Sequence, residues 1–225
     1  GGNVLMQSFA VGRTQDLIYY LGLLYHQGRV PQQVVFLDSP MAIGANAIYT
    51  LFQEQLEIQP GIPGDDNRQR IETWLPIFRA TPTAEESMAI NRFKSGAIII
   101  AGSGMCNGGR ILHHFKHNLW REECHLIIPG FQASGTLGRA IVDGAKTVKL
   151  MHQRIAVKAQ VHTLGGFSAH AGQSQLIEWA SQFKTRPELY LVHGELDKMR
   201  ALQEALRDRL DWQANIPEPG DRIAL

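Results

Sequence analysis

The sequence predicts an α/β fold with a largely parallel sheet and flanking helices. Short apolar runs alternate along the chain with segments whose apolar residues recur every three or four positions, the pattern of βαβ units. At least one apolar run leads straight into a glycine-rich turn and then a helix. With 225 residues, of which 44% are hydrophobic and 19% charged, the chain is globular and can bury a substantial core.

The first predicted elements are a strand and a helix. Residues 4–9 are expected to form a short strand. Leu17, Leu21 and Leu24 then share one helical face, and Gly28 ends that helix.

The next elements are a second strand–helix unit and a loop. A strand of the buried type at 34–37 ends at Asp38, and the Ser39–Pro40 turn begins a helix that is expected to run to about residue 56. Residues 60–67 contain two Pro, two Gly and two Asp, which predicts a loop.

The central part of the chain contains the clearest strand–loop–helix unit. Thr83 and Glu86 form a capping-box pattern for a helix that is expected to run to about residue 93. The continuous apolar strand 97–101 then runs directly into the glycine loop 102–109. The elements expected after this loop are helices at 110–119, 137–142, 173–183 and 198–210, and strands at 126–128, 148–151, 155–164 (long enough for a hairpin) and 189–192.

Charge and cysteine content narrow the class of protein. The formal net charge is only +1, so any nucleic-acid binding must come from a local patch. Cys106 and Cys124 fit no disulfide framework and no metal knuckle, which indicates a reducing cytosol. No signal peptide pattern and no apolar run long enough to span a membrane occur. We therefore expect a cytoplasmic protein without a membrane partner.

Two histidines stand out by their surroundings. His170 lies in the small-residue segment GFSAHAG, which leaves room for a phosphate, a metal or a backbone to approach. His193 follows the apolar run 189–192 and precedes Gly194, so we expect it at the rim of a sheet, where ligand clefts of α/β proteins lie. From these residues alone, two surface or satisfied core histidines are an equal alternative.

The glycine loop GSGMCNGGR is a candidate phosphate site. Glycines let the backbone approach a ligand, and N–H groups at a helix N-terminus favour anions. The residues expected to contact phosphate are Gly104, Asn107, Gly108 and Arg110, the last as a bidentate donor. The alternative is a turn with a purely structural use. A dinucleotide fingerprint is excluded, because Asn107 stands where that motif needs glycine.

Four further residues at predicted strand ends or turns are weaker candidates. Arg139 in GTLGR and Arg13 after Gly12 could reach phosphate, although Arg139 could equally pair with an acid on a solvated face. Asp38 and Ser39 follow a strand, and a helix cap at the Pro40 turn is an alternative to substrate contact. Three other histidines are expected along a helix surface, with no metal between them: His113, His114 and His117.

Several segments together resemble one family in the same order along the chain. They are FAVGRTQDL (9–17), LDSPMA (37–42), AGSGMCNGGRILHH (101–114), GFQASGTLGR (130–139), GFSAHAG (166–172), LVHGE (191–195) and IPEPGDRIAL (216–225). The sequence is therefore similar to the β-CASP nucleases, RNA-processing enzymes of the metallo-β-lactamase superfamily. The resemblance implies a β-CASP domain at 1–160 and, at 161–225, the C-terminal RNA-metabolising segment of the metallo-β-lactamase αββα fold.

The resemblance also implies roles for individual residues. His170 would be the general acid that protonates the leaving oxygen, a task suited to imidazole, or would help to position the scissile phosphate. His193 would be a zinc ligand. Ser168, one of the small residues around His170, is a further candidate to contact the substrate phosphate. Gly172 stands where the family often has an Asp that could orient the neighbouring histidine. An esterase that uses Ser168 is a poor alternative, because its nucleophile elbow needs GxSxG and His170 occupies the fifth position.

The family's HxHxDH zinc motif does not occur in this sequence. We therefore expect the chain to be the later part of a longer zinc-dependent ribonuclease with two zinc ions, nearly inactive alone. Its expected partners are single-stranded RNA and the N-terminal metallo-β-lactamase domain, and a homo-oligomer is left open. The alternative is a non-catalytic RNA-binding or scaffold member of the same family.

Overall fold

The computed structural model describes residues 1–52, 55, 74–167 and 170–223. The chain forms two compact units, Gly1–Ser168 and Ala169–Leu225. The expected end of the second helix near residue 56 and the expected loop at 60–67 lie outside the described residues.

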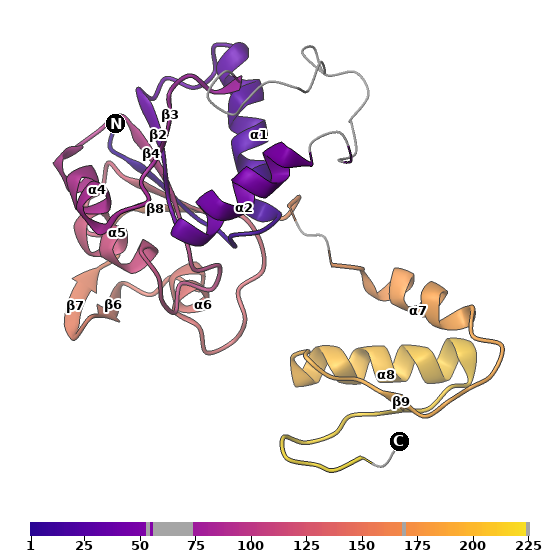
Figure 1. The fold of residues 1–225 in the computed structure, drawn as a ribbon. Coiled ribbons are helices and arrows are strands. Elements are labelled where there is room, and N and C mark those ends of the chain that lie inside the picture. Colours follow the sequence, from indigo (N-terminus) through magenta and orange to yellow (C-terminus); the bar gives the residue numbers. More distant parts are fainter. Residues whose placement is uncertain (53–54, 56–73, 168–169, 224–225) are drawn as a thin grey trace. The chain divides into compact units, whose positions relative to one another are not determined.

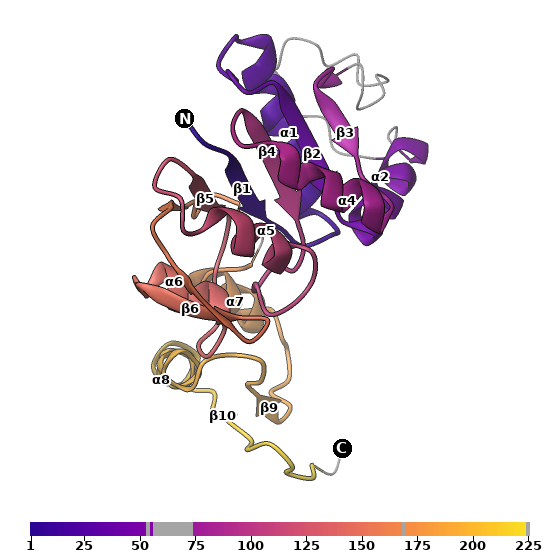
Figure 2. The same cartoon turned by 90° about the vertical axis from the view of Figure 1, so that its left-hand side faces the viewer.

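The first unit is built on a six-stranded sheet in which every neighbouring pair of strands is parallel. The strand order is β3-β2-β4-β1-β5-β8, and Figure 2 labels β3, β2, β4, β1 and β5. The bounds are β1 Val4–Gln7, β2 Val34–Asp38, β3 Phe78–Ala80, β4 Ala97–Ala101, β5 His125–Ile128 and β8 Gln160–Thr163. The predicted fold class is thus confirmed, although β3 was missing from the prediction.

Both faces of this sheet are covered, which explains the apolar runs in its strands. All five residues of β4 are buried, as expected for a central parallel strand. The helices α1 (Arg13–His26) and α2 (Pro40–Leu51) cover one face, and α5 (Ile111–Asn118) and α6 (Leu137–Val142) cover the other (Figure 1).

The helices that follow adjacent strands leave the sheet on opposite faces. The chain passes from β1 to α1 on one face, whereas it passes from β4 to α5 and from β5 to α6 on the other. The helices that follow these three strands therefore lie on opposite faces, although the loops that lead to them share the carboxyl edge of the sheet. In open α/β sheets, ligands bind at the carboxyl ends of such strands, so this edge is the natural place for a site.

The predicted capping box is confirmed at α4 (Ala84–Ala89). The Thr83 hydroxyl accepts a hydrogen bond from the Glu86 N–H at 3.2 Å, and the Glu86 carboxylate accepts one from the Thr83 N–H at 2.9 Å. The α-helix is shorter than expected, because residues Ile90–Arg92 form the 3₁₀ helix η2 instead of a last α-helical turn.

The expected long strand at 155–164 is divided in the structure. β6 (Thr147–Leu150) and β7 (Gln153–Ala156) form an antiparallel hairpin, and its turn residues Met151 and His152 have positive φ angles. The Val157 N–H still donates to the Lys146 carbonyl opposite it in the hairpin, but the next two N–H groups, of Lys158 and Ala159, donate to the Leu119 carbonyl instead. The chain thereby reaches the edge of the main sheet, where β8 pairs with β5.

The second unit consists of α7 (Gln173–Ser181), β9 (Leu189–Tyr190), α8 (Leu196–Leu210) and β10 (Ala214–Asn215). Its two strands pair in parallel, and Figure 2 shows them with α8. Its core consists of Ile177, Ala180, Leu206, Trp212 and Ala214. β9 is only two residues long and half-buried, so the expectation of a buried strand over 189–192 was wrong. The strand that pairs with β9 is β10, which has only two residues, so the ladder between them is also two residues long.

The unit boundary lies eight residues after the expected domain boundary at 160, because β8 belongs to the main sheet. The domain division 1–160 and 161–225 stays a prediction.

Among the described helices, none is both long and apolar enough to cross a membrane.

Candidate functional site at the carboxyl edge of the sheet

The loops that follow β1, β2, β4 and β5 meet at the carboxyl edge of the parallel sheet. They contain most of the residues predicted for a site in the first unit. The loop after β1 is joined to β4 beyond the last ladder pair, since the Ser8 N–H donates to the Ala101 carbonyl at 3.0 Å. Parallel pairing is thus what gathers segments that are distant in the sequence.

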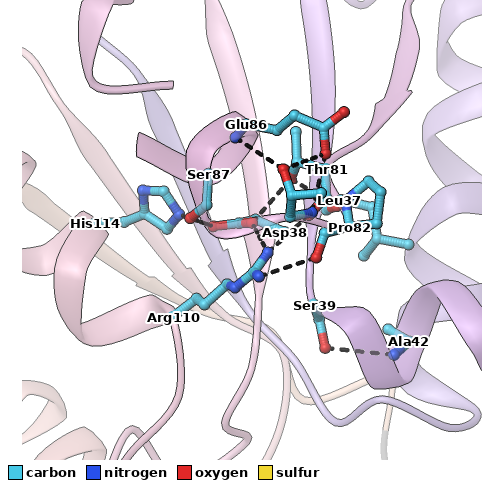
Figure 3. Close-up of polar contacts among 11 residues, drawn as sticks. Leu37, Asp38, Ser39, Ala42, Thr81, Pro82, Glu86, Ser87, Arg110 and His114 are labelled. Atoms are coloured by element: carbon cyan, nitrogen blue, oxygen red, sulfur yellow. Dashed lines mark hydrogen bonds and ion pairs between the residues drawn. The ribbon is translucent and has the colours of Figure 1, made fainter. Parts of the chain in front are cut away.

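Asp38, the last residue of β2, is the centre of a buried polar cluster (Figure 3). Its side chain is 0% exposed and accepts four hydrogen bonds of 2.6–2.8 Å from other side chains. The donors are Thr81 Oγ1, Ser87 Oγ, Arg110 NH1 and His114 Nε2. These five residues, called the Asp38 cluster below, join the ends of β2 and β3 to α4 and α5.

The Asp38 carboxylate is held in its charged form. Burial by itself raises the pKa of a carboxyl group. The four hydrogen bonds, first that from His114, outweigh this effect and lower the pKa of Asp38 to about 2. With no capacity left for substrate, Asp38 acts here as a structural anchor rather than a contact residue.

Arg110 is bound inside the same cluster. Its guanidinium donates to Asp38 and to the Thr81 carbonyl, both at 2.7 Å, and to the Pro82 carbonyl at 3.0 Å. Such a charge-assisted arrangement fixes the start of α5 relative to the strand ends. Arg110 could therefore contact a phosphate only through the guanidinium N–H groups that these three hydrogen bonds do not use.

His114 is buried, with 1% of its surface exposed, which corrects the expectation that it lies along a helix surface. The buried face of α5 also contains Ile111, Phe115 and Asn118, at helical spacing from His114. His113 and His117 are both exposed. Only one of the three histidines thus belongs to the polar core.

Ser39 caps α2, as the alternative interpretation predicted. Its side-chain oxygen accepts a hydrogen bond from the Ala42 N–H at 3.4 Å, and Pro40 occupies the first turn. This contact accounts for the residue types at Ser39 and Pro40 without a substrate.

The glycine loop after β4 is tied to the loop after β5. The Gly104 carbonyl accepts a hydrogen bond from Gln132 Nε2 at 2.9 Å. Asn107 Oδ1 accepts one from the Leu137 N–H at 3.0 Å, at the start of α6. The two glycine-containing loops therefore form one connected surface.

The start of α5 offers fewer donors to an anion than expected. The N–H groups of Ile111, Leu112 and His113 donate to the carbonyls of Gly102, Gly109 and Arg110, respectively. These N–H groups are not available to a phosphate, so the expectation of free N–H donors at the start of α5 is wrong for these three residues. Cys106 in the same loop is buried, and burial raises the pKa of its thiol to about 12, which disfavours the reactive thiolate near neutral pH.

We predict that Gly109→Ala destabilises the first unit strongly and that Gly108→Ala does not. Gly109 has φ +73°, and an added Cβ would lie 2.4 Å from the Gly102 carbonyl oxygen, whereas nothing lies within 4 Å of a Cβ at Gly108. A left-handed alanine and an overpacked contact together cost about 2–5 kcal/mol of unfolding free energy. Urea denaturation of both variants measures the loss in unfolding free energy. Equal losses in Gly109→Ala and Gly108→Ala would contradict this prediction.

Arg139 pairs with Asp143 on the surface of α6, as the alternative interpretation predicted. Its Nε donates to both carboxylate oxygens at 2.9 Å, and both side chains are exposed.

Arg13, the other candidate arginine, contacts the loop after β5 at the carboxyl edge. Its NH1 donates to the Pro129 carbonyl at 2.9 Å, and its guanidinium lies 5.5 Å from the centre of the Phe167 ring.

His170 and His193 both lie exposed in the second unit. His193 follows β9 in a left-handed conformation with φ 64°. Across the described ranges, no group of three or more His, Cys, Asp or Glu side chains could hold a metal ion. Ser168 lies outside the described residues.

Comparison with known families agrees with this architecture. A sequence model of the Beta-Casp domain matches residues 14–141, more than half of the chain. The chain belongs to the β-CASP family. A second model, described as the Zn-dependent metallo-hydrolase RNA specificity domain, matches residues 154–217 and so covers most of the second unit. The resemblance read from the motifs is thus confirmed.

Curated proteins similar to this β-CASP chain have two kinds of names. Ribonuclease TTHA0252 from Thermus thermophilus is 39% identical over 210 residues, which are 92% of this chain and 46% of that protein. Transcription termination factor FttA from Methanocaldococcus jannaschii is 32% identical over 231 residues, 99% of this chain and 36% of that protein. An RNase J-like protein from the same organism is 29% identical over 87% of this chain and 44% of its own length. The chain thus spans less than half of each of these relatives.

Sequence reasoning missed several residues of this β-CASP site. Ser87, Thr81 and Gln132 gave no signal, because each acts through a partner far away in the sequence. His114 did give a sequence signal of burial, because its position three residues after Ile111 and one before Phe115 places it on the apolar face of the helix.

Proposed function

We propose that this chain is the RNA-holding part and the RNA-specificity segment of a zinc-dependent β-CASP ribonuclease that hydrolyses phosphodiester bonds in RNA processing or decay. The observation that carries the proposal is the pair of family matches. The first lies within the first unit, and the second, described as belonging to a Zn-dependent metallo-hydrolase, extends from residue 154 in the first unit over most of the second. The connected glycine loops at the carboxyl edge support it, because they offer a backbone surface to a strand of RNA.

In this proposal the chain contributes one zinc ligand, His193, to a site completed by residues outside the chain. The described residues do not fit a complete site, since no group of three or more ligand-type side chains is present among them. Zinc normally needs three or four protein ligands. An exposed imidazole after a short strand can complete such a site but cannot form it by itself.

His170 is proposed as the general acid. An exposed imidazole can donate a proton to the leaving oxygen of the scissile phosphodiester. The phosphate contacts assigned to Ser168, Arg139 and the glycine-loop residues remain part of the proposal. Arg13 is favoured over Arg110 and Arg139, because the latter two guanidinium groups are paired with Asp38 and Asp143.

A second candidate function is a role in transcription termination, with or without cleavage. It is favoured by the relatives named transcription termination factor FttA, which match 99–100% of this chain at 31–32% identity. Both candidates require RNA contact and differ in whether the complete protein cleaves RNA.

We predict that the 225-residue chain alone is nearly inactive as a nuclease, because it supplies at most one of the expected zinc ligands. The test is incubation of the purified chain with labelled single-stranded RNA and zinc or manganese. The expected result is intact RNA. Cleavage that requires metal, co-purifies with the chain and disappears in His193→Ala would contradict the proposal that the zinc site lies mainly outside this chain.

A further inference from the structure

Two exposed phenylalanine rings stand at the carboxyl edge, on the loops that join the sheet to its helices. Phe9 follows β1 and is 50% exposed, and Phe131 follows β5 and is 56% exposed. The strands β1 and β5 are neighbours, so the two loops leave adjacent positions of the sheet. Single exposed apolar residues are common, but these two rings lie on neighbouring loops of one edge, where aromatic faces can stack nucleobases.

Phe9 is held rigidly by the glycine loop. Its ring lies so close to Gly104 that an added Cβ there would come within 2.4 Å of the ring. Its carbonyl accepts a hydrogen bond from Thr14 Oγ1 at 2.6 Å. The backbone of Gly104 therefore supports the ring, and half of its surface still faces solvent.

Phe131 is connected to the same glycine. The side-chain amide of Gln132 donates to the Gly104 carbonyl and to the Phe131 carbonyl, both at 2.9 Å. Gly104 thus anchors both aromatic loops, which makes their geometry preorganised.

A cation lies at the same edge. Arg13 donates to the carbonyl of Pro129, two residues before Phe131. A Cβ at the intervening Gly130 would lie 3.8 Å from Arg13 NH1. Rigid exposed rings beside a guanidinium match what single-stranded nucleic acid needs, since bases stack on aromatic faces and the backbone is anionic.

We propose that Phe9 and Phe131 form a base-stacking surface for single-stranded RNA, with Arg13 facing the RNA backbone. This inference rests on the proposed function and adds to it the side chains that hold nucleobases. Because every base presents a π-face, the surface binds RNA with little sequence preference.

The test is the affinity of the 225-residue chain for labelled oligoadenylate and for an abasic ribose-phosphate strand of the same length, at low salt. Phe9→Leu and Phe131→Leu are each expected to weaken oligoadenylate binding roughly 5- to 150-fold, the range for loss of one stacked base. Phe9→Tyr and Phe131→Tyr should keep wild-type affinity, because they keep the ring. The wild-type chain should prefer oligoadenylate to the abasic strand.

Trp120→Leu is the matched control. Trp120 is 54% exposed and lies between α5 and β5, at the amino ends of the strands. Its replacement should leave affinity unchanged. Leucine variants that bind like the wild type, or equal affinity for the abasic strand, would overturn the stacking surface and leave the proposed function standing. Absence of binding to either strand would overturn the proposed RNA-holding role and this inference with it.

Discussion

Replacing Asp38 with alanine is expected to destabilise the first unit by about 3–5 kcal/mol, the range for breaking a buried ion pair. Asp38 accepts four hydrogen bonds, and its loss would leave the Arg110 guanidinium and the buried His114 imidazole without their common acceptor. Urea denaturation followed by circular dichroism measures the free energy of unfolding. Unchanged stability in the variant would show that the Asp38 cluster does not hold this edge together.

Asp143→Ala provides the control for this prediction. Asp143 also pairs with an arginine, but both partners are exposed, so its loss should cost at most about 0.5 kcal/mol. A comparable loss in both variants would indicate that burial of the Asp38 cluster contributes nothing.

The same carboxylate makes stability depend on acid pH. The folded-state pKa of Asp38 is lowered from 3.8 to about 2. Because the pKa is lowered in the folded state, ionised Asp38 contributes its full share to the free energy of unfolding above pH 3.8. This contribution is lost as the pH falls through about 2. The wild-type chain should therefore lose stability between these pH values more steeply than Asp38→Asn, whose side chain does not titrate.

In the complete protein, His170→Ala is expected to lower the single-turnover rate of RNA cleavage by about 10²–10⁴-fold, the usual contribution of a general acid. His170 is exposed in the segment GFSAHAG, where a substrate can reach it. Rapid mixing of excess enzyme with labelled RNA isolates the chemical step.

His113→Ala is the matched control for His170→Ala. His113 is also an exposed histidine, but it lies on α5 and has no proposed role. Its replacement should leave the cleavage rate unchanged. A wild-type rate in His170→Ala would remove the residue from the mechanism.

The elements that local patterns determine could be predicted from the sequence. The capping box of Thr83 and Glu86 is confirmed in both of its hydrogen bonds, because it spans only three residues. The parallel sheet follows from buried apolar runs such as β4, whose residues are covered on both faces.

The polar contacts at the carboxyl edge could not be predicted in the same way. Asp38 lies 43 to 76 residues from its four partners, and only the strand order brings them together. The sequence alone therefore suggests a phosphate donor at Arg110, although Asp38 and two backbone carbonyls bind its guanidinium. β9 was predicted too long, because apolar composition does not reveal that its partner β10 has only two residues.

We propose that the second unit serves a zinc-dependent catalytic centre through two histidines with different roles, His193 as a zinc ligand and His170 as the general acid. The most direct measurement is the zinc content of the complete protein purified as His193→Ala and as His170→Ala. We expect His193→Ala to lower the zinc content, because the proposed ligand is lost, and His170→Ala to keep the wild-type amount. Zinc loss in His170→Ala together with full zinc content in His193→Ala would contradict the two assignments.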